Sequence, residues 1–442
     1  MSREYEEVNA ALLARGFTRM DFDIQKIRDL MDVLGSPQRA YPSIHLTGTN
    51  GKTSTARMID SLLRAHGLHT GRYTSPHLET VRERISLDGE PISEEQLVAV
   101  YHEIQPVAEL IDARNSEPLT YFDMTTAMAY ATFADAPVDI AVVEVGLGGA
   151  EDATNVIEAG ISVITPIGLD HTEWLGDTIS DIAWAKAGII HKGATVISAI
   201  QTEEAMRPLL ERTAEMGATL AREGSEFGVI HRDIAVGGQM LTLQGLGGVY
   251  DEVFLPLFGA HQAQNAALAL AAVEAFLGAG PDKQLEPEVV REGFITVDSP
   301  GRLERVRSAP AILLDGAHNP HGMAATVRAL EEEFAFRTLV VVFAVLGDKD
   351  AAGLLDLLEP VTSQIVVTQN SSPRSMPLNE LSQIAVEIFG EDRVTVADTM
   401  PDAIEEAVVL AESDTDGEHA GVGVLVTGSI VTVADARKLL KK

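Results

Sequence analysis

Residues 43–66 read SIHLTGTNGKTSTARMIDSLLRAH, and this stretch decides the fold. The short apolar run Ser43–Thr47 predicts a buried strand, and Thr53–His66 is expected to form the helix after it. Between them lies GTNGKTST, Gly48–Thr55. Glycines at these positions let backbone N–H groups turn inward, and the start of a helix adds partial positive charge. The stretch therefore predicts a loop that binds phosphate groups.

Two side chains of this loop have expected roles. Lys52 would bridge the terminal phosphates, and Thr53 would face a metal ion. The standard pattern has glycine at position 46, where this chain has Leu46. The alternative is an ordinary glycine-rich turn with a threonine that caps the helix. Because Lys-Thr follows the second glycine directly, we favour the phosphate loop.

Apolar runs of strand length alternate with helical stretches along the rest of the chain. Strands are expected at Ile140–Val145, Ile161–Pro166, Ala311–Asp315, Leu339–Phe343, Gln364–Thr368 and Gly423–Thr427, and helices at Phe122–Phe133, Glu203–Met216 and Gln262–Leu277. This alternation indicates βαβ units and a mostly parallel sheet. Residues 227–258 are glycine-rich with short apolar runs, which predicts a small antiparallel addition.

The length of 442 residues suggests two or three domains at about 150 residues each. The segment VDSPGR, residues 297–302, contains Pro-Gly, and the βα rhythm restarts after it. We therefore predict an α/β phosphate-loop domain over residues 1–297 with a central, mostly parallel sheet. A smaller, Rossmann-like α/β domain would follow over residues 298–442.

Composition excludes several classes of function. A formal net charge of −33 argues against nucleic acid as a partner, because phosphate backbones require a basic surface. The absence of cysteine excludes disulfides, thiolate metal sites and cysteine nucleophiles. We see neither a signal peptide nor an apolar run long enough for a membrane span. We expect a cytoplasmic protein with no membrane partner.

Three polar residues lie where the expected strands end, and they are candidate magnesium ligands: Ser75 in TSPH, Glu144 in DIAVVEVG and His171 in GLDH. Ligands of open α/β sheets gather beyond the carboxyl ends of the strands. A bare carboxylate such as Glu144 is expensive to bury in an apolar run. The alternatives are a turn residue before Pro76 for Ser75, an ion pair for Glu144, and a capping or packed histidine for His171.

Lys186 lies in the apolar stretch IAWAKAGII. Burial lowers the pKa of a lysine, and the resulting neutral amine can react with carbon dioxide to form a carbamate. The alternative from the sequence alone is a lysine that extends its ammonium to solvent or pairs with an aspartate.

Further candidates occur later in the chain. Asn265, in the first turns of the helix in GAHQAQNAALAL, could bond a base or a phosphate; the alternative is simple solvation. Arg302 in PGRLE lies at the predicted domain junction, where it could reach nucleotide. Asp315 in LLDGAHNPHG ends a strand, where a carboxylate can accept ribose hydroxyls. These positions predict a cleft whose closure would exclude water.

An ordered set of motifs resembles the folylpolyglutamate synthase/dihydrofolate synthase family of the Mur ligase superfamily. The motifs are GTNGKTST, TSPHLETVRERI, EVGLGG with DATN, GLDHTEWLG, AWAKAGI, AHQAQNAALA, PGRLE and DGAHNPHG, followed by GDKD and TGSI. The match spans roughly residues 40–325 and extends through GDKD and TGSI towards the C-terminus. A single motif would be weak evidence, whereas this ordered set is highly specific.

The resemblance implies a role for each matching residue. Nucleotide-binding residues would be Gly48, Thr49, Asn50, Gly51, Lys52, Thr53, Ser54, Asn265, Arg302 and Asp315. Magnesium would be held by Ser75, Glu144, His171 and a carbamylated Lys186. Lys52, Lys186 and His318 would serve catalysis, and Asn319 would lie with His318 near the glutamate and phosphate end. Phe122 and Asp123 become pterin-site candidates, and SPHLETVRERI resembles the mobile folate-binding loop of the family.

One position departs from the pattern. Family members often read GGRxDATN, whereas this chain reads GGAEDATN, with Ala150 in place of the arginine. A cation near the expected site is therefore missing. Arg82 or Arg84 could supply it instead, and Arg82 is our substrate-binding candidate.

The resemblance implies an ATP- and Mg²⁺-dependent ligase that adds L-glutamate to 7,8-dihydropteroate, to reduced folates, or to both, through an acyl phosphate. We expect it to act as a monomer. One alternative is a Mur ligase of peptidoglycan synthesis, but those normally have a nucleotide-sugar domain before the phosphate loop, and only about 40 residues precede Ser43. Another alternative is a non-catalytic nucleotide-binding scaffold, since fold alone does not establish activity.

Overall fold

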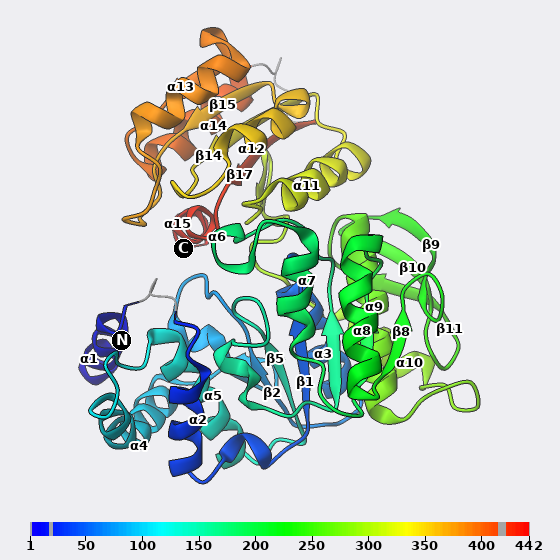
Figure 1. The fold of residues 1–442 in the computed structure, drawn as a ribbon. Coiled ribbons are helices and arrows are strands. Elements are labelled where there is room, and N and C mark those ends of the chain that lie inside the picture. Colours follow the sequence, from blue (N-terminus) through cyan, green and yellow to red (C-terminus); the bar gives the residue numbers. More distant parts are fainter. Residues whose placement is uncertain (1, 17–20, 414–420, 442) are drawn as a thin grey trace. The chain divides into compact units, whose positions relative to one another are not determined.

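The computed structural model describes residues 2–16, 21–413 and 421–441. The chain forms two compact units (Figure 1). The first contains most of the chain up to Val297, and the second contains Asp298 onwards together with Ile234–Gln239 and Leu257–Gln262. The predicted division into domains 1–297 and 298–442 stays a prediction. Within the described ranges, no helix is both long and apolar enough to cross a membrane.

The first unit is built on an eight-stranded sheet with the order β4-β3-β2-β5-β1-β6-β7-β8. The strands are β1 Ser43–Thr47, β2 Thr70–Tyr73, β3 Ile85–Leu87, β4 Glu90–Pro91, β5 Ile140–Glu144, β6 Ile161–Ile164, β7 Thr195–Ser198 and β8 Thr219–Arg222. Strand β1 lies between β5 and β6 and runs parallel to both. At one edge of the sheet, β3 is antiparallel both to β2 and to β4. All five residues of β1 are buried, as expected for a central parallel strand.

Helices cover this sheet. They are α1 Arg3–Ala14, α2 Ile24–Val33, α3 Lys52–Ala65, α4 Glu94–Asp112, α5 Tyr121–Asp135, α6 Thr172–Leu175, α7 Ile179–Ala187, α8 Glu203–Met216, α9 Ala260–Leu277 and α10 Pro287–Ile295, with 3-10 helices η1 Pro37–Arg39, η2 Val81–Arg84 and η3 Ala153–Val156. One apolar core joins α1, α2, α4 and α5 to strands β2 and β5. Another joins α7 and α8, which lie side by side, to strands β6 and β7 (Figure 1). The two cores hold the carboxyl ends of the parallel strands at one edge, where loops can form a site.

A separate three-stranded sheet has the order β11-β10-β9, with β9 Gly228–Ala235, β10 Gly238–Gln244 and β11 Val249–Leu255. Only two residues separate β9 from β10, and such a short connection requires antiparallel neighbours. This sheet is the small antiparallel addition predicted from the glycine-rich composition of residues 227–258.

The second unit has a six-stranded sheet with the order β12-β13-β17-β14-β15-β16. Its elements are β12 Glu304–Ser308, β13 Ala311–Leu314, β14 Thr338–Phe343, β15 Gln364–Val367, β16 Val394–Val396, β17 Val422–Thr427, α11 Pro320–Glu333, α12 Ala351–Leu358, α13 Leu378–Phe389, α14 Met400–Ser413, α15 Ile430–Leu440, η4 Glu359–Val361 and η5 Glu391–Arg393. Strand β12 is antiparallel to β13, and the other strands are parallel.

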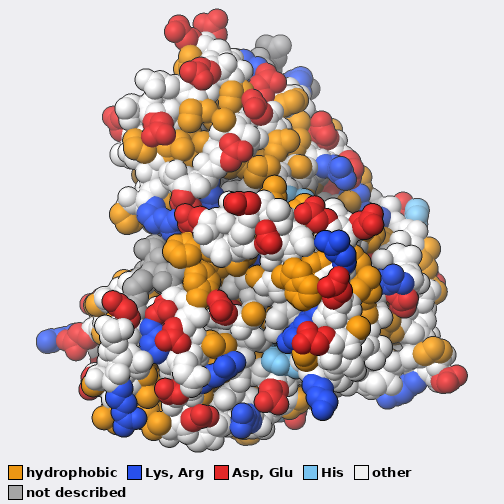
Figure 2. All heavy atoms as spheres, viewed as in Figure 1, with side chains coloured by type: hydrophobic (Ala, Val, Ile, Leu, Met, Phe, Trp, Pro, Cys, Tyr) orange, Lys and Arg blue, Asp and Glu red, His pale blue; other side chains and the backbone are white. Residues whose placement is uncertain are grey.

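The predicted fold class is confirmed in both units. The strand predicted at Ser43–Thr47 is β1 and the helix predicted at Glu203–Met216 is α8, with the same bounds. The helix predicted over Thr53–His66 begins one residue earlier, at Lys52. Acidic side chains are spread over the face drawn in Figure 2, in keeping with the net charge of −33.

Candidate active site

The phosphate loop lies between the carboxyl end of β1 and the start of α3. Gly48 has a φ of 149°, and a Cβ there would lie 1.8 Å from the Thr165 hydroxyl oxygen. Gly51 has a φ of 89°, and its Cβ would lie 2.6 Å from Oδ1 of Asn265. Both positions therefore require glycine. Leu46 is fully buried inside β1, so the loop begins at Gly48, and the glycine that is missing at position 46 would fall within the strand.

The loop is anchored to the segment that follows β6. The Thr49 amide donates to the Pro166 carbonyl at 2.9 Å. The Thr49 hydroxyl donates to the Gly168 carbonyl and accepts from the Gly168 amide, both at 3.0 Å. These bonds fix the loop against the segment that leads to Asp170 and His171. Asn265 is only 4% exposed, so solvation does not account for its place beside Gly51.

Two lysines meet at one carbonyl of the loop. Lys52 Nζ donates to the carbonyl oxygens of Gly48 at 2.9 Å and Thr49 at 3.2 Å. Lys186 Nζ, from α7, donates to the same Gly48 oxygen at 3.0 Å. Lys186 is 4% exposed, so its ammonium does not reach solvent. Burial, with a further contribution from the Lys52 charge, lowers the pKa of Lys186 to about 7, although Asp170 and Asp152 oppose this shift.

A cluster of oxygen atoms lies beside the loop. Glu144 ends β5 and is 1% exposed. The Thr53 hydroxyl donates to its two carboxylate oxygens at 2.9 and 3.0 Å, and the Ser75 amide donates to Oε2 at 3.3 Å. The fold thus brings together Thr53, Ser75 and Glu144 from three separate segments.

These oxygen donors fit magnesium, which prefers hard oxygen ligands and keeps water or phosphate oxygens in its other positions. Among the residues that the structure describes, no group of three or more His, Asp or Glu side chains could hold a metal ion by itself. A magnesium ion at Glu144 would therefore complete its coordination with further donors, such as hydroxyl groups of the chain, water or phosphate oxygens.

His171 takes an unusual backbone conformation at the start of α6. Its φ is 53°, in the left-handed region, and its side chain makes no capping hydrogen bond to the helix. Its Nε2 lies 3.8 Å from the carboxylate of Asp170, and the same carboxylate accepts the His171 amide at 2.9 Å. The predicted capping alternative is therefore wrong, and the metal-ligand role of His171 stays a prediction. Asp170 was not among the residues singled out from the sequence.

A buried network of hydrogen bonds between side chains and backbone amides supports the loop after β5. Asp152 accepts the amides of Leu147 at 2.8 Å and Thr154 at 2.9 Å, and also the Thr154 hydroxyl. Since that hydroxyl donates to the carboxylate, it must accept its 2.9 Å bond from Nε2–H of His45, on β1. Burial lowers the pKa of His45 to about 3, which keeps the imidazole neutral. The motif DATN was recognised in the sequence, but this supporting role was not predicted.

Ala150, in place of the family arginine, packs on the end of the helix that bears Lys186. Its amide donates to the Ala185 carbonyl at 2.9 Å, and a Cβ on Gly188 would lie 2.3 Å from the Ala150 Cβ. Of the two arginines expected to compensate, Arg82 donates to the Ile92 carbonyl at 3.1 Å. Arg84 is 4% exposed, and its guanidinium lies 5.0 Å above the Tyr121 ring.

The two pterin-site candidates differ in their surroundings. The Phe122 ring lies 5.9 Å from the ring of Tyr73 and covers Gly146, where a Cβ would approach it to 2.5 Å. It therefore lies close to the end of β5. Asp123 is the third residue of α5, and its carboxylate accepts the amide and hydroxyl of Thr120, each at 2.7 Å. This capping box accounts for Asp123 without a ligand, and its substrate role stays a prediction.

In the second unit, four predicted residues lie in two segments: Arg302 precedes β12, and Asp315, His318 and Asn319 follow β13. Asp315 is 5% exposed; it accepts the amides of Leu303 at 2.9 Å and Ala317 at 3.0 Å, and the Thr326 hydroxyl at 2.8 Å. The other three residues also form local hydrogen bonds. Arg302 Nη1 donates to the Gly301 carbonyl at 3.1 Å, and His318 Nδ1 lies 2.9 Å from the Gly316 carbonyl oxygen. Asn319 Oδ1 accepts the Gly322 amide at 2.8 Å. The loop is therefore rigidly held, with Asp315 at its centre.

Both parts of the chain match known families. Residues 46–273 match the Mur ligase middle domain, and residues 301–430 match the Mur ligase glutamate ligase domain. The chain is 52% identical to the dihydrofolate synthase/folylpolyglutamate synthase of Mycobacterium tuberculosis, covering 96% of this chain and 91% of that protein.

Solved structures agree with these matches. The Mycobacterium tuberculosis folylpolyglutamate synthase complexed with ADP and AMPPCP superposes with a TM-score of 0.91 at 53% identity, covering 95% of this chain and 96% of that one. An FPGS–AMPPCP–folate complex superposes with a TM-score of 0.86 at 31% identity, covering 99% of this chain and all of that one.

Proposed function

The chain belongs to the dihydrofolate synthase/folylpolyglutamate synthase family of Mur ligases, and from this premise we propose the reaction that it performs. It joins L-glutamate to 7,8-dihydropteroate, to reduced folates, or to both, and ATP drives the ligation. The observation that carries the proposal is the pair Lys52 and Lys186 on the Gly48 carbonyl, beside Thr53 and Glu144.

The phosphate loop is suited to bind ATP. Gly48 to Ser54 would surround the β- and γ-phosphates with backbone amides and the positive end of α3. Lys52 Nζ lies over the loop carbonyls, from which it can turn to a γ-phosphate oxygen. Asn265 would contact the nucleotide beside Gly51. Arg302 and Asp315 are proposed to bind the nucleotide, and His318 and Asn319 to bind the glutamate and phosphate end.

Magnesium is the proposed cofactor, with Ser75, Glu144 and His171 as its protein ligands. When bound, it would neutralise charge on the phosphates. Lys186 is proposed to be carbamylated: its neutral amine adds to carbon dioxide, an N–C bond forms, and one proton is released. The side chain changes from a cation to a carboxylate. Burial, which lowers the pKa of Lys186 to about 7, provides the neutral amine that this addition requires.

The reaction is proposed to proceed in two steps. A carboxylate oxygen of the pterin substrate attacks the γ-phosphorus, and the bond from that phosphorus to ADP breaks. The neutral amine of glutamate then attacks the acyl carbon, inorganic phosphate leaves, and the amide nitrogen loses a proton. Lys52 stabilises the charge on the transferred phosphoryl group, and positioning supplies most of the remaining rate enhancement.

Phe122 and Arg82 are proposed to contact the pterin substrate, with Asp123 beside them. A peptidoglycan ligase is the less suitable assignment, because the chain covers 91% of a folate-family relative at 52% identity. We also propose that the protein acts as a monomer, which light scattering during gel filtration would test.

The decisive experiment is a ligation assay in which dihydropteroate and tetrahydrofolate are offered separately with ATP, Mg²⁺ and radiolabelled glutamate. We expect glutamate to be incorporated with at least one acid, together with phosphate release that requires both acid and glutamate. A non-catalytic scaffold would release no phosphate under these conditions, and that result would refute the proposal.

A further inference from the structure

The segment between β2 and β3 is a closed loop held by one of its own carboxylates. Its two ends meet where the Thr74 amide donates to the Arg84 carbonyl at 3.0 Å, next to the antiparallel pair Tyr73 and Ile85. Within this loop, residues 74–84, the Glu83 carboxylate folds back over the residues that precede it. Neither the sequence nor the proposed reaction assigns Glu83 a role.

Three consecutive amides donate to Glu83. Oε2 accepts the amide of Leu78 at 2.9 Å, and Oε1 accepts those of Glu79 at 2.9 Å and Thr80 at 2.8 Å. Thr80 and Glu83 also form a reciprocal capping box at the start of η2. Hydrogen bonds to a charged acceptor are stronger than neutral ones, so one side chain determines the shape of residues 78–80.

The two flanks of this loop touch the candidate site. On one side, the Ser75 amide donates to Glu144 at 3.3 Å. On the other, Arg84 Nε donates to His77 Nδ1 at 2.9 Å while its guanidinium covers the Tyr121 ring. Residues 78–80 connect these flanks and lead into η2, which carries both Arg82 and Arg84.

We infer that Glu83 is a positioning residue for the organic-acid substrate: it holds residues 74–84 in the shape that presents Arg82 and Arg84 to that substrate. The inference rests on the proposed function, in which this loop contacts the pterin substrate. ATP binding should be independent of Glu83, because the phosphate loop is anchored through Thr49 to Pro166 and Gly168 instead.

The test compares Glu83→Ala with Glu90→Ala. Glu90 is exposed on the neighbouring strand β4. Its replacement therefore makes the same change of charge without removing the hydrogen bonds between Glu83 and residues 78–80. We expect Glu83→Ala to raise the KM for the acid substrate about tenfold, the effect of losing one net charge-assisted hydrogen bond. The KM for ATP should change less than about twofold, within the range of exposed surface substitutions. Glu90→Ala should leave both KM values unchanged.

Glu83→Gln provides a second measurement, since it keeps one acceptor oxygen and should recover part of the affinity. If Glu83→Ala does not fold, a selective rise of the acid KM in Glu83→Gln supports the inference, and an unchanged acid KM overturns it. Equal rises in the KM for acid and for ATP would show a general structural role and would also overturn it. Absence of ligation by the unaltered protein refutes the proposed function. If the unaltered protein is active but replacement of Glu83 leaves the KM for the acid unchanged, only this inference is refuted.

Discussion

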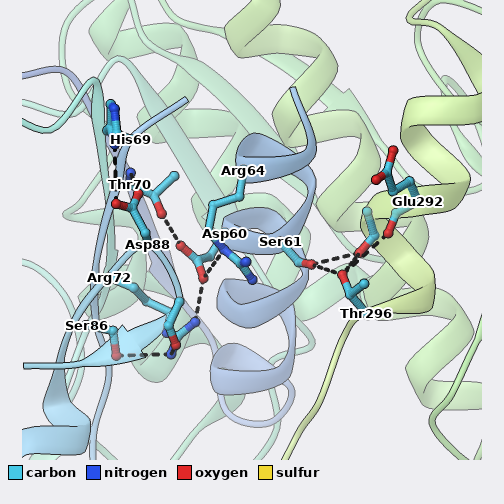
Figure 3. A network of polar contacts seen from close by, with 12 residues as sticks. Asp60, Ser61, Arg64, His69, Thr70, Arg72, Ser86, Asp88, Glu292 and Thr296 are labelled. Carbon is cyan, nitrogen blue, oxygen red and sulfur yellow. Dashed lines mark hydrogen bonds and ion pairs between the residues drawn. The ribbon is translucent and has the colours of Figure 1, made fainter. Parts of the chain in front are cut away.

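Two places along helix α3 gather positive charge, and they differ in what the charges meet. At the start of the helix, Lys52 and Lys186 donate to the same Gly48 carbonyl. Two turns later, Arg64 and Arg72 meet the carboxylate of Asp60 (Figure 3). In the first place the two ammonium groups share a neutral oxygen, while the carboxylates of Asp170 and Asp152 also act on Lys186; in the second place the guanidinium groups contact an anion directly.

The Asp60 carboxylate is paired with two arginines and one hydroxyl group. Arg72 Nη1 lies 2.6 Å and Arg64 Nε 3.4 Å from Oδ2, and the Thr70 hydroxyl donates to Oδ1 at 2.6 Å. Arg72 also bonds Ser86 on β3 at 3.1 Å, so the network ties α3 to β2 and β3 (Figure 3). Asp60 is completely buried. Such an arrangement fixes the fold.

The lysine site is arranged differently. The two ammonium groups approach one oxygen, and the Lys52 charge contributes to the low pKa of Lys186. Like charges held together in a buried place are unfavourable unless an anion joins them. We interpret the contrast as follows: the chain pairs its arginines with an anion at Asp60, whereas beside Gly48 two ammonium groups share one carbonyl oxygen, an arrangement that an anionic ligand would stabilise.

The largest effect should follow from breaking the balanced site. Asp60→Ala would leave the buried guanidinium of Arg72 without its anion, and we expect a loss of about 3–5 kcal/mol of unfolding free energy. Urea unfolding measures this loss. Asp135→Asn, at an exposed position at the end of α5, is the control and should change stability by less than about 0.5 kcal/mol. A similar loss of unfolding free energy in both variants would show that the ion pairs of Asp60 do not stabilise the fold more than an exposed carboxylate does.

The opposite outcome is expected at the phosphate loop. Lys52→Ala should lower kcat/KM for ligation by about 10²–10³-fold, because one preorganised donor to the transferring phosphoryl group is lost. Its urea midpoint should stay close to that of the unaltered protein. Lys192→Ala, at an exposed position, serves as the control. Near-normal turnover by the Lys52 variant would defeat the assignment of this loop.

Glu144→Gln tests whether the oxygen atoms around Glu144 bind magnesium, in contrast to the carboxylate of Asp60, which is paired with arginines. The substitution keeps the shape and the Thr53 contact but removes the negative charge. We expect the magnesium concentration for half-maximal activity to rise about 10–100-fold, the range seen when the immediate surroundings of a metal are altered. An unchanged magnesium titration would count against a ligand role for Glu144.

The smallest effect concerns the pH dependence of Lys186. Its pKa of about 7 lies below the ordinary value of 10.5, so the unfolded chain binds an additional proton between these pH values. Stability should therefore rise with pH across this window, and the penalty of burial should be fully present below pH 7. Labelling of Lys186 by an amine reagent should increase about tenfold per pH unit up to 7 and then level off.

Peptide mass spectrometry after pulse labelling would measure this profile, with an added lysine-containing peptide as the reference whose labelling continues to increase towards pH 10. In the Lys52→Ala variant the midpoint should move upwards, since one of the causes of the shift is gone. A midpoint for Lys186 that matches the midpoint of the reference peptide would show that the amine is not perturbed.

The sequence alone predicted the elements whose signals are local. Ser43–Thr47 forms a strand because a short apolar run between turn residues has few alternatives, and the spacing of Gly51-Lys52-Thr53 predicts a phosphate loop between that strand and helix α3. Glu144 was singled out because a carboxylate at the end of an apolar run is costly to bury. These inferences needed no knowledge of distant residues.

Other features depend on which distant residues meet, and sequence spacing does not encode such meetings. Lys186 bonds a carbonyl 138 positions away, and Thr53 bonds a carboxylate 91 positions away. Asp60 and Glu144 are both buried carboxylates, and only the tertiary structure shows that arginines surround one and hydroxyl and amide donors approach the other. The sequence determined which residues are able to do chemistry; packing determined their partners, because burial and charge balance are properties of the assembled core.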